Sequence, residues 1–412
     1  MGPIRRRGAL APMTFDIYEL GLLLSVTTAV ALICERLRLP YTIGLVLAGL
    51  ALAATPLKIE LPLSKDFVYT FLLPPLLFEA ALRLSWPRLR RDLPVILTLA
   101  GPGLIASALL LAAGMHWIAG WSWTAAGLFG ALISATDPVA VVATFDEARV
   151  RGRVDLLVRA ESLINDGTAA TVFAILLAIA LGAPAAPMDV TWTLLLTVGG
   201  GLASGFAVAG ALLFLVGRTN NNLVKITLTT LCGYGSFLLA QRIDASGVLA
   251  ALAAGLVVAQ GSRWGLFGST GQGAVAAFWE YVAFLVNSVI FILIGLHEAE
   301  RHFLPVFWPV FVALALAVAS RAVAVYPFCG LFWGTRYAVE LRHQHVLFWG
   351  GFRGALALAL ALGLPTSISE RDDLVTVTFA VVAFSVFVQT LVMIPLLYRL
   401  GVIRRPADRA QG

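Results

Sequence analysis

Apolar runs of about membrane-spanning length alternate with short polar segments along nearly the whole chain. A helix needs about 20 predominantly apolar residues to cross a bilayer. We therefore expect thirteen spans, of which the second and ninth are short: 16–33, 41–55, 66–82, 93–115, 122–145, 155–181, 191–216, 223–241, 245–260, 274–296, 304–333, 343–363 and 373–398. The connecting segments have no room for a separate soluble domain, so the pattern predicts an all-α polytopic membrane protein.

The composition agrees with this fold class. Of the 412 residues, 59% are hydrophobic and 13% are charged, whereas a soluble domain carries about 25% charged residues. The net charge of +6 arises in the loops and the C-terminal tail, so it does not indicate nucleic-acid binding. Cys34, Cys232 and Cys329 are far apart in apolar surroundings, and we interpret them as buried thiols rather than as a metal or redox site.

Basic residues outside the spans predict the orientation of the chain. Alternate loops with the span ends next to them, starting after the first span and including the tail, carry 19 Lys and Arg residues, and the other loops carry 5. By the positive-inside rule the richer set is cytoplasmic. The N-terminus is then outside and the C-terminus cytoplasmic, in a plasma membrane that in a bacterium is the inner membrane. Arg5, Arg6 and Arg7 oppose this orientation, so either they are absent from the natural product or the span count is off by one.

The two halves of the chain are weakly similar. LVLAGL at 45–50 resembles LAAGLV at 252–257, and the span interrupted at Asp137-Pro138 has a counterpart interrupted by the glycine-rich stretch 350–354. Paired broken segments in two halves are typical of transporters with a midplane substrate site. We expect two inverted repeats around a linking seventh span, with the two interrupted helices crossing near the midplane.

Acidic and amide side chains lie inside two neighbouring apolar spans. Thr136 and Asp137 are in one span, and the run Glu161-Ser162-Leu163-Ile164-Asn165-Asp166 is in the next. A charged residue at the membrane centre costs at least about 2.5 to 3.5 kcal/mol, so the default interpretation is an ion or proton site. Pro138 has no N–H, which frees backbone carbonyls around Thr136 to coordinate a small cation.

Helical spacing divides the second cluster into two stripes. Ser162 and Asp166 are four residues apart and share one face of the helix, and Glu161 and Asn165 form the neighbouring stripe. Hydroxyl and carboxylate oxygens suit Na⁺ or Li⁺, and no thiolate or imidazole cluster suits a transition metal. The alternative is a buried polar network that only ties helices together.

Two basic residues, Arg321 and Arg353, fall inside spans at about the depth of Asp166, as judged from the rise per residue of a helix. A midplane arginine needs a partner, so we interpret Glu161 and Arg321 as a structural ion pair. Arg353 is a candidate donor to carbonyls at the crossing. For Glu79 two roles stay open: an interfacial acid in a kinked span, or a residue of the cation path.

Four motifs together resemble one known group of proteins: SATDPVAVVATF (134–145), ESLINDGTA (161–169), FLLPPLLFEAAL (71–82) and GFRGALALAL (351–360). They resemble the electroneutral branch of the monovalent cation/proton antiporter superfamily, which includes bacterial Na⁺/H⁺ antiporters and sodium/hydrogen exchangers. Electrogenic relatives carry two adjacent aspartates where this chain has Asn165-Asp166, and a lysine where it has Arg321.

The resemblance implies which residues form the ion site. Asp166 is expected to bind the cation, helped by Asp137, Ser162 and the backbone carbonyl of Thr136, with Asn165 beside them. It also implies that Glu161 pairs with Arg321. Arg353 and Glu79 remain supporting residues.

The resemblance also implies a homodimer of thirteen-span protomers, in which a core domain moves like an elevator against a dimer domain. The dimer domain is expected to comprise 1–92 (spans one to three) and 223–303 (spans eight to ten). The core transport domain comprises 93–181 (spans four to six) and 304–398 (spans eleven to thirteen). The linking seventh span lies in 182–222, and 399–412 form a short cytoplasmic tail.

The leading functional interpretation is a secondary antiporter that exchanges Na⁺ or Li⁺ for H⁺, electroneutrally and one for one. Asn165 cannot titrate and an arginine stays protonated, so one carboxylate holds either ion at equal net charge. The partners are monovalent cations, protons, lipid and a second copy of the chain, without a cofactor and without enzymatic activity.

Three alternatives remain beside this interpretation. A K⁺/H⁺ antiporter of the same fold stays open, because oxygen ligands do not separate K⁺ from Na⁺. A passive cation channel is less favoured, since the sequence has no carbonyl filter of the TVGYG kind. An intramembrane protease needs a GxGD-type aspartate pair or a Ser/His pair, and neither is evident.

Overall fold

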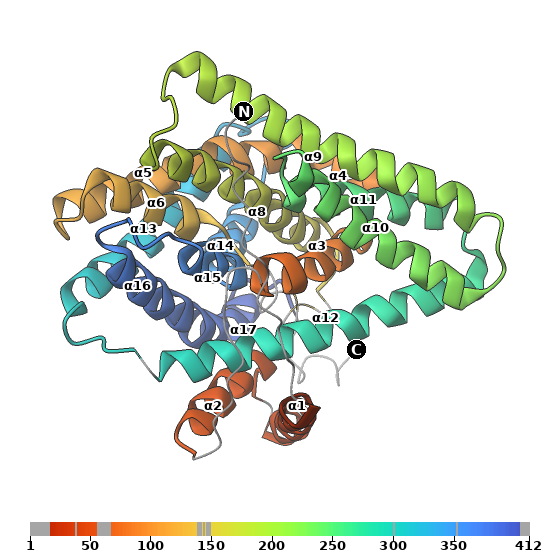
Figure 1. Ribbon diagram of the computed structural model, residues 1–412, viewed down its shortest axis with the longest axis horizontal. Coiled ribbons are helices and arrows are strands. Elements are labelled where there is room, and N and C mark those ends of the chain that lie inside the picture. The colour runs from red at the N-terminus through yellow and green to blue at the C-terminus, as the bar shows by residue number, and fades with distance from the viewer. Residues whose placement is uncertain are drawn as a thin grey trace, which may run out of the picture.

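The computed structural model describes residues 17–37, 39–55, 67–137, 142, 145, 150–299, 301–351 and 353–403, and within these ranges all regular structure is helical (Figure 1). The first half of the chain forms α1 (Ile17–Leu37), α2 (Tyr41–Ala53), η1 (Phe67–Leu72), α3 (Leu73–Leu82), α4 (Trp86–Thr98), η2 (Leu99–Gly103), α5 (Leu104–Trp117), α6 (Trp123–Ser134), α8 (Arg153–Ala180) and α9 (Pro187–Val216). The second half forms α10 (Asn222–Arg242), α11 (Gly247–Arg263), α12 (Gly268–Glu298), α13 (Phe307–Gly330), α14 (Leu341–Trp349), α15 (Ala355–Leu362), α16 (Arg371–Phe384), η3 (Ser385–Gln389) and α17 (Thr390–Arg399).

Each of the thirteen predicted spans contains a helical segment, which confirms the all-α polytopic fold class. Seven helical stretches in the described part of the chain are long and apolar enough to cross a membrane, and α2, η1–α3, α6 and α11 are shorter apolar helices. Two predicted spans are interrupted, as expected. The span predicted at 122–145 is helical up to Ser134, and the span predicted at 343–363 is divided into α14 and α15.

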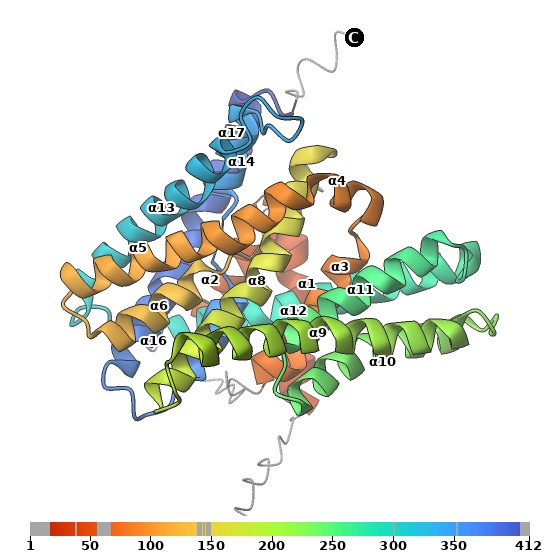
Figure 2. The same ribbon diagram turned by 90° about the horizontal axis from the view of Figure 1, so that it is seen from above.

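The helices pack in two groups. In one group α2 lies against α12, and α11 lies against α3, α9 and α10; in the other, α5 lies against α6 and α13, and α8 against α4 and α6. Figure 2 shows α5 beside α13, and α9 beside α10. The α2–α12 crossing is close because Gly49 and Gly295 face the partner backbone: a Cβ at either position would overlap a carbonyl oxygen of the other helix.

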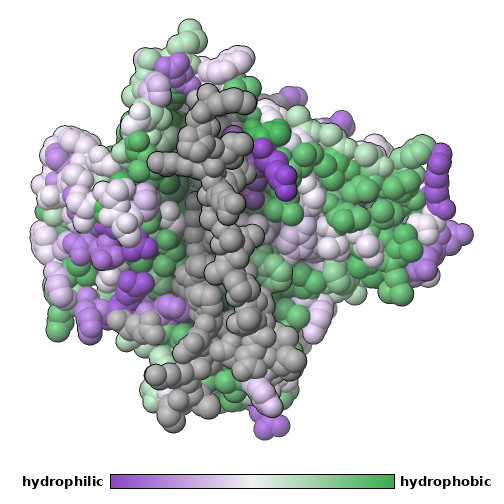
Figure 3. All heavy atoms as spheres, viewed as in Figure 1, coloured by the Kyte–Doolittle hydropathy of each residue, from purple (hydrophilic) through white to green (hydrophobic). Residues whose placement is uncertain are grey.

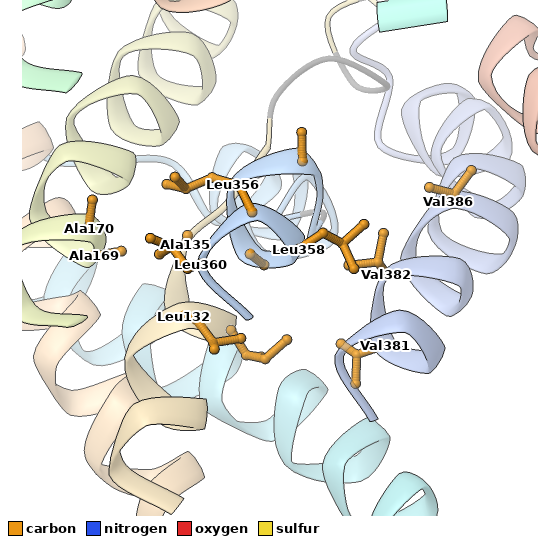
Figure 4. Packing of buried hydrophobic residues seen from close by; sticks show 14 of the residues in the cluster. Leu132, Ala135, Ala169, Ala170, Leu356, Leu358, Leu360, Val381, Val382 and Val386 are labelled. Atoms are coloured by element: carbon orange, nitrogen blue, oxygen red, sulfur yellow. The ribbon is translucent and has the colours of Figure 1, made fainter. Parts of the chain in front are cut away.

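Helix α15 lies at the centre of the second group (Figure 4). Its sequence is ALALALAL, and all seven residues from Ala355 to Ala361 are buried. Leu356 and Leu360 lie near Ala135, and Leu358 lies near Val382 of α16. A helix that is apolar on every side is stable only when other elements surround it, so α15 is held inside a shell formed by α6, α8 and α16.

The outer surface is strongly apolar. Large side chains such as Leu195, Phe206 and Phe214 on α9 and Leu231 and Leu238 on α10 are more than 40% exposed. Figure 3 shows a broad hydrophobic area on the side formed by α9, α10 and α11, with hydrophilic residues at the end where α9 joins α10. Soluble monomers rarely expose such an area; together with the long apolar helices it indicates a multi-pass membrane protein.

Candidate functional site

The two interrupted helices meet at their breaks. Helix α6 begins with a capping bond from Ala125 N–H to Ser122 Oγ (3.2 Å) and ends at Ser134. The residues from Ala135 to Asp137 are not helical, and Pro138 lies outside the described residues. Arg353, in the break between α14 and α15, donates from Nη1 to the carbonyl oxygen of Ala135 (3.3 Å). The breaks are therefore in direct contact although their residues are 218 positions apart.

Asp137 lies at the beginning of α15. Its Oδ2 accepts a hydrogen bond from the backbone N–H of Ala355 (3.4 Å), the first residue of that helix. The first N–H groups of a helix have no partner inside the helix and favour a negative charge. Gly354 makes this approach possible, because a Cβ there would overlap the Asp137 carboxylate. The N–H groups at the beginning of α15, in the second break, thus stabilise the negative charge of Asp137 in the first break.

The predicted stripe of Ser162 and Asp166 on α8 faces this crossing. Thr136 and Ser162 are fully buried, and the Thr136 hydroxyl donates to Ser162 Oγ (3.2 Å). Asp166 is 8% exposed. Asp137 and Asp166 line the same cavity of about 50 Å³, together with the apolar side of α3 and the first residues of α15. The cavity has room for a small cation with water, since one water needs about 10–15 Å³ of such volume.

The neighbouring stripe of α8 belongs to a separate network. Glu161 is 1% exposed, and Arg321 of α13 binds both its oxygens, Nη1 to Oε1 (2.7 Å) and Nη2 to Oε2 (3.0 Å). Arg321 also donates to the carbonyl oxygen of Leu347 in α14 (2.9 Å from Nη2), and Gly351 leaves space for its side chain. The pair therefore joins three helices, α8, α13 and α14.

Asn165 lies between the two stripes. Its Nδ2 donates to Glu161 Oε1 (3.2 Å), which places the amide in the network of the ion pair. Its Oδ1 is buried and has no hydrogen-bond partner in the part of the chain that the structure describes. Among the described residues, the side-chain oxygen of Asn165 is thus available to a ligand.

Glu79 lies away from the two carboxylates, in a second cavity of about 240 Å³. It forms an ion pair with Arg83, the residue that follows the last residue of α3. Leu76 and Ala80 line both cavities, so the second cavity adjoins the first along one side of α3. This position is compatible with the cation path, one of the two roles left open for Glu79.

Several further residues of this region were not predicted from the sequence. The second cavity is lined, besides Glu79, by Arg159 of α8 and by Glu280 and Asn287 of α12. Glu280 had a visible signal, because it is an acid inside the predicted span 274–296. The signal for Gly354 was weaker. The glycine-rich stretch 350–354 predicts a break, but the local sequence does not indicate which carboxylate lies against Gly354.

Comparison with known proteins gives consistent results. Residues 22–399 match the family described as sodium/hydrogen exchanger, transmembrane. The chain is 34% identical to the Na⁺/H⁺ antiporter ApNhaP of Aphanothece halophytica over 405 residues, which cover 96% of this chain and 76% of that protein. It is 32% identical to the Na⁺/H⁺ antiporter NhaH of Halobacillus dabanensis, covering 94% of this chain and 99% of that protein.

The fold is also that of a solved structure. The sodium proton antiporter MjNhaP1 from Methanocaldococcus jannaschii superposes with a TM-score of 0.73 over 93% of this chain and 98% of that chain, at 21% identity. The resemblance stated from the four motifs is thereby confirmed. The family match extends over almost the whole membrane region, and the chain belongs to the sodium/hydrogen exchanger family, a family of membrane transporters.

Proposed function

We propose that this protein is a secondary antiporter that exchanges Na⁺ or Li⁺ for H⁺, with Asp166 as the group that binds either ion. The observation that carries the proposal is the shared cavity, in which the carboxylates of Asp166 and Asp137 lie together at the crossing of two broken helices. The relatives named as Na⁺/H⁺ antiporters support the identity of the ions.

The cation is proposed to bind Asp166, Asp137, Ser162 and the backbone carbonyl of Thr136. All are hard oxygen ligands, which suit an alkali cation. The hydrogen bond between Thr136 and Ser162 fixes the first break against α8 and so holds these oxygens near one another. Asn165, with its unused Oδ1, is the fifth candidate ligand. Proton binding to Asp166 is proposed to release the cation, which makes the two ions competitors.

Alternating access is proposed to follow an elevator movement. In this proposal α4–α8 and α13–α17 form the core that carries the ion, α1–α3 and α10–α12 form the dimer domain of a homodimer, and α9 links them. The ion cavity lies between α3 of one group and α8 and α15 of the other, so sliding of one group against the other changes its access. We place the protein in the plasma membrane, with the basic loops in the cytoplasm.

Transport assays test the proposal. Purified protein in proteoliposomes is expected to take up ²²Na⁺ against its gradient when a pH gradient is imposed, and Li⁺ in excess is expected to compete. Uptake of ⁸⁶Rb⁺, a tracer for K⁺, driven by the pH gradient without any pH-driven uptake of ²²Na⁺ would identify the K⁺/H⁺ alternative. Uptake that only follows the cation gradient, whatever the pH gradient, would indicate a passive channel.

The exchange is expected to be electroneutral. Clamping the membrane potential at zero or at about −100 mV with K⁺ and valinomycin supplies about 2.3 kcal/mol per net charge moved. One-for-one exchange moves no net charge, so the rate is expected to be equal at both potentials. Because H⁺ and Na⁺ are proposed to compete for Asp166, the apparent KM for Na⁺ is expected to rise as pH falls. A several-fold effect of the potential would exclude one-for-one exchange.

A second expected result concerns Gly354→Ala. The added Cβ overlaps the Asp137 carboxylate, and overpacking of this kind costs about 1–3 kcal/mol. Because Asp137 must move away from α15, pH-driven Na⁺ uptake is expected to fall at least about fivefold. Gly210→Ala in α9 is the matched control, since nothing lies within 4 Å of its added Cβ. Equal uptake by both variants would show that Asp137 does not need this position.

A further inference from the structure

A concave, strongly basic site lies outside the ion cavity and shares no lining residue with it. A cavity of about 620 Å³ is lined by Arg90, Arg91, Asp92, Arg153, Arg336 and Tyr337. The residues come from the first half of α4, the first residue of α8 and the connection between α13 and α14. Figure 2 shows α4 and α14 at the same end of the molecule.

One arginine of this site, Arg153, is bonded to other residues of the protein. Arg153 forms an ion pair with Asp92 (Nη2 to Oδ1, 2.7 Å) and donates to the carbonyl oxygens of Tyr337 (2.8 Å) and Ala338. These bonds join the beginning of α8 to α4 and to the α13–α14 connection. They also neutralise the only carboxylate that lines the cavity within the described residues.

The other three arginines have no anionic partner in the described part of the chain. Arg90 and Arg91 have no hydrogen bond or ion pair there, and Arg336 lies over the Tyr337 ring (4.7 Å from Cζ to the centroid) and donates to its hydroxyl. The site therefore carries a net charge of +3. Like charges held together in a concave surface attract counter-ions and repel the transported cations.

We propose that this basic site binds a phosphate-bearing anion. Guanidinium groups bind phosphate through paired, charge-assisted hydrogen bonds, and three of them line this cavity with no carboxylate among the described residues to satisfy them. Two sources offer this chemistry, the headgroup of an anionic phospholipid and a soluble phosphate. Trp86, 44% exposed, and Trp333, 87% exposed, lie on the same elements as the arginines. Tryptophan is enriched at the membrane–water interface, which places the site at headgroup depth.

The bound anion acts on the cytoplasmic ends of three elements of the proposed core. It neutralises the repulsion among Arg90, Arg91 and Arg336, and it adds bonds beside those of Arg153 between α4, α8 and the α13–α14 connection. Helix α8 carries Asp166, and α14 leads to the break that holds Arg353. The expected consequence is a higher melting temperature of the whole protein with the anion present.

The test uses the full chain, purified in a neutral detergent, with ionic strength and Na⁺ held constant. The probes are sodium pyrophosphate, dioctanoyl phosphatidylglycerol and, as a zwitterionic comparison, dioctanoyl phosphatidylcholine. We expect the melting temperature to rise by several degrees with pyrophosphate, phosphatidylglycerol or both, and not with phosphatidylcholine. A shift with phosphatidylglycerol alone identifies a lipid headgroup as the source, and a shift with pyrophosphate alone identifies a soluble phosphate.

Two triple variants with equal loss of charge make the test specific. Arg90→Gln, Arg91→Gln and Arg336→Gln together are expected to weaken the binding of the active probe at least about tenfold. The control combines Arg36→Gln, Arg218→Gln and Arg263→Gln, which remove three exposed arginines at or just beyond the C-terminal ends of α1, α9 and α11. The control is expected to respond like the wild type. Equal responses of the two triple variants, or no shift of the wild type with either anionic probe, would overturn the proposal.

Discussion

Asp166→Asn is expected to abolish pH-driven Na⁺ uptake while the protein still folds. Asparagine has nearly the same shape as aspartate, so the walls of the cavity shared with Asp137 stay in place. The amide has no charge and does not titrate, so the site loses the group that holds either ion. The measurement is ²²Na⁺ uptake into proteoliposomes driven by a pH gradient, and normal uptake by the variant would remove Asp166 from the mechanism.

A control and a second readout separate loss of the site from loss of the fold. Asp189→Asn removes an exposed carboxylate in the first turn of α9 and is expected to leave uptake unchanged. Na⁺ that binds only the folded protein stabilises it by about 2.7 kcal/mol at a concentration one hundred times Kd. This Na⁺-dependent rise in melting temperature is expected in the wild type and in Asp189→Asn, and to be absent in Asp166→Asn.

The number and order of the membrane spans could be predicted because each span is an apolar run in the sequence. The ends of the helices were less predictable. Helix α12 begins at Gly268, six residues before the predicted span, and α4 begins at Trp86, seven before. Backbone hydrogen bonds continue a helix beyond the hydrocarbon core, where polar side chains such as Ser269 and Arg88 are solvated and hydropathy gives no signal.

The site was predictable to the extent that it depends on spacing within one helix. The separation of four residues placed Ser162 with Asp166 and Glu161 with Asn165, and the structure shows these as distinct stripes of α8. Contacts between elements were harder to foresee. The bond from Ala355 to Asp137 joins residues 218 apart, and the second cavity around Glu79 and Glu280 depends on how α3, α8 and α12 pack. Such contacts arise from tertiary packing, which local pattern does not encode.

Removal of either member of the Glu161–Arg321 pair is expected to destabilise the whole protein. Arg321→Ala leaves the Glu161 carboxylate, which is 1% exposed, with only the Asn165 amide bonded to it among the described residues. Glu161→Ala leaves a buried guanidinium whose one remaining partner among the described residues is the carbonyl oxygen of Leu347. An uncompensated buried charge typically costs about 3–5 kcal/mol, so both variants are expected to melt well below the wild type in detergent.

The double variant, and a control variant in an exposed ion pair, distinguish loss of the buried ion pair from nonspecific destabilisation by the substitutions. Glu161→Ala combined with Arg321→Ala leaves no unpaired charge, so it is expected to melt above at least one of the single variants, which gives a coupling energy of the pair. Arg342→Ala is the control, because its ion pair with Glu340 has side chains 50% and 60% exposed and is worth at most about 1 kcal/mol. Arg321→Lys is expected to lie between wild type and Arg321→Ala, since an ammonium group keeps the charge but not the two parallel bonds. Single variants that melt like the wild type would show that the pair does not hold α8, α13 and α14 together.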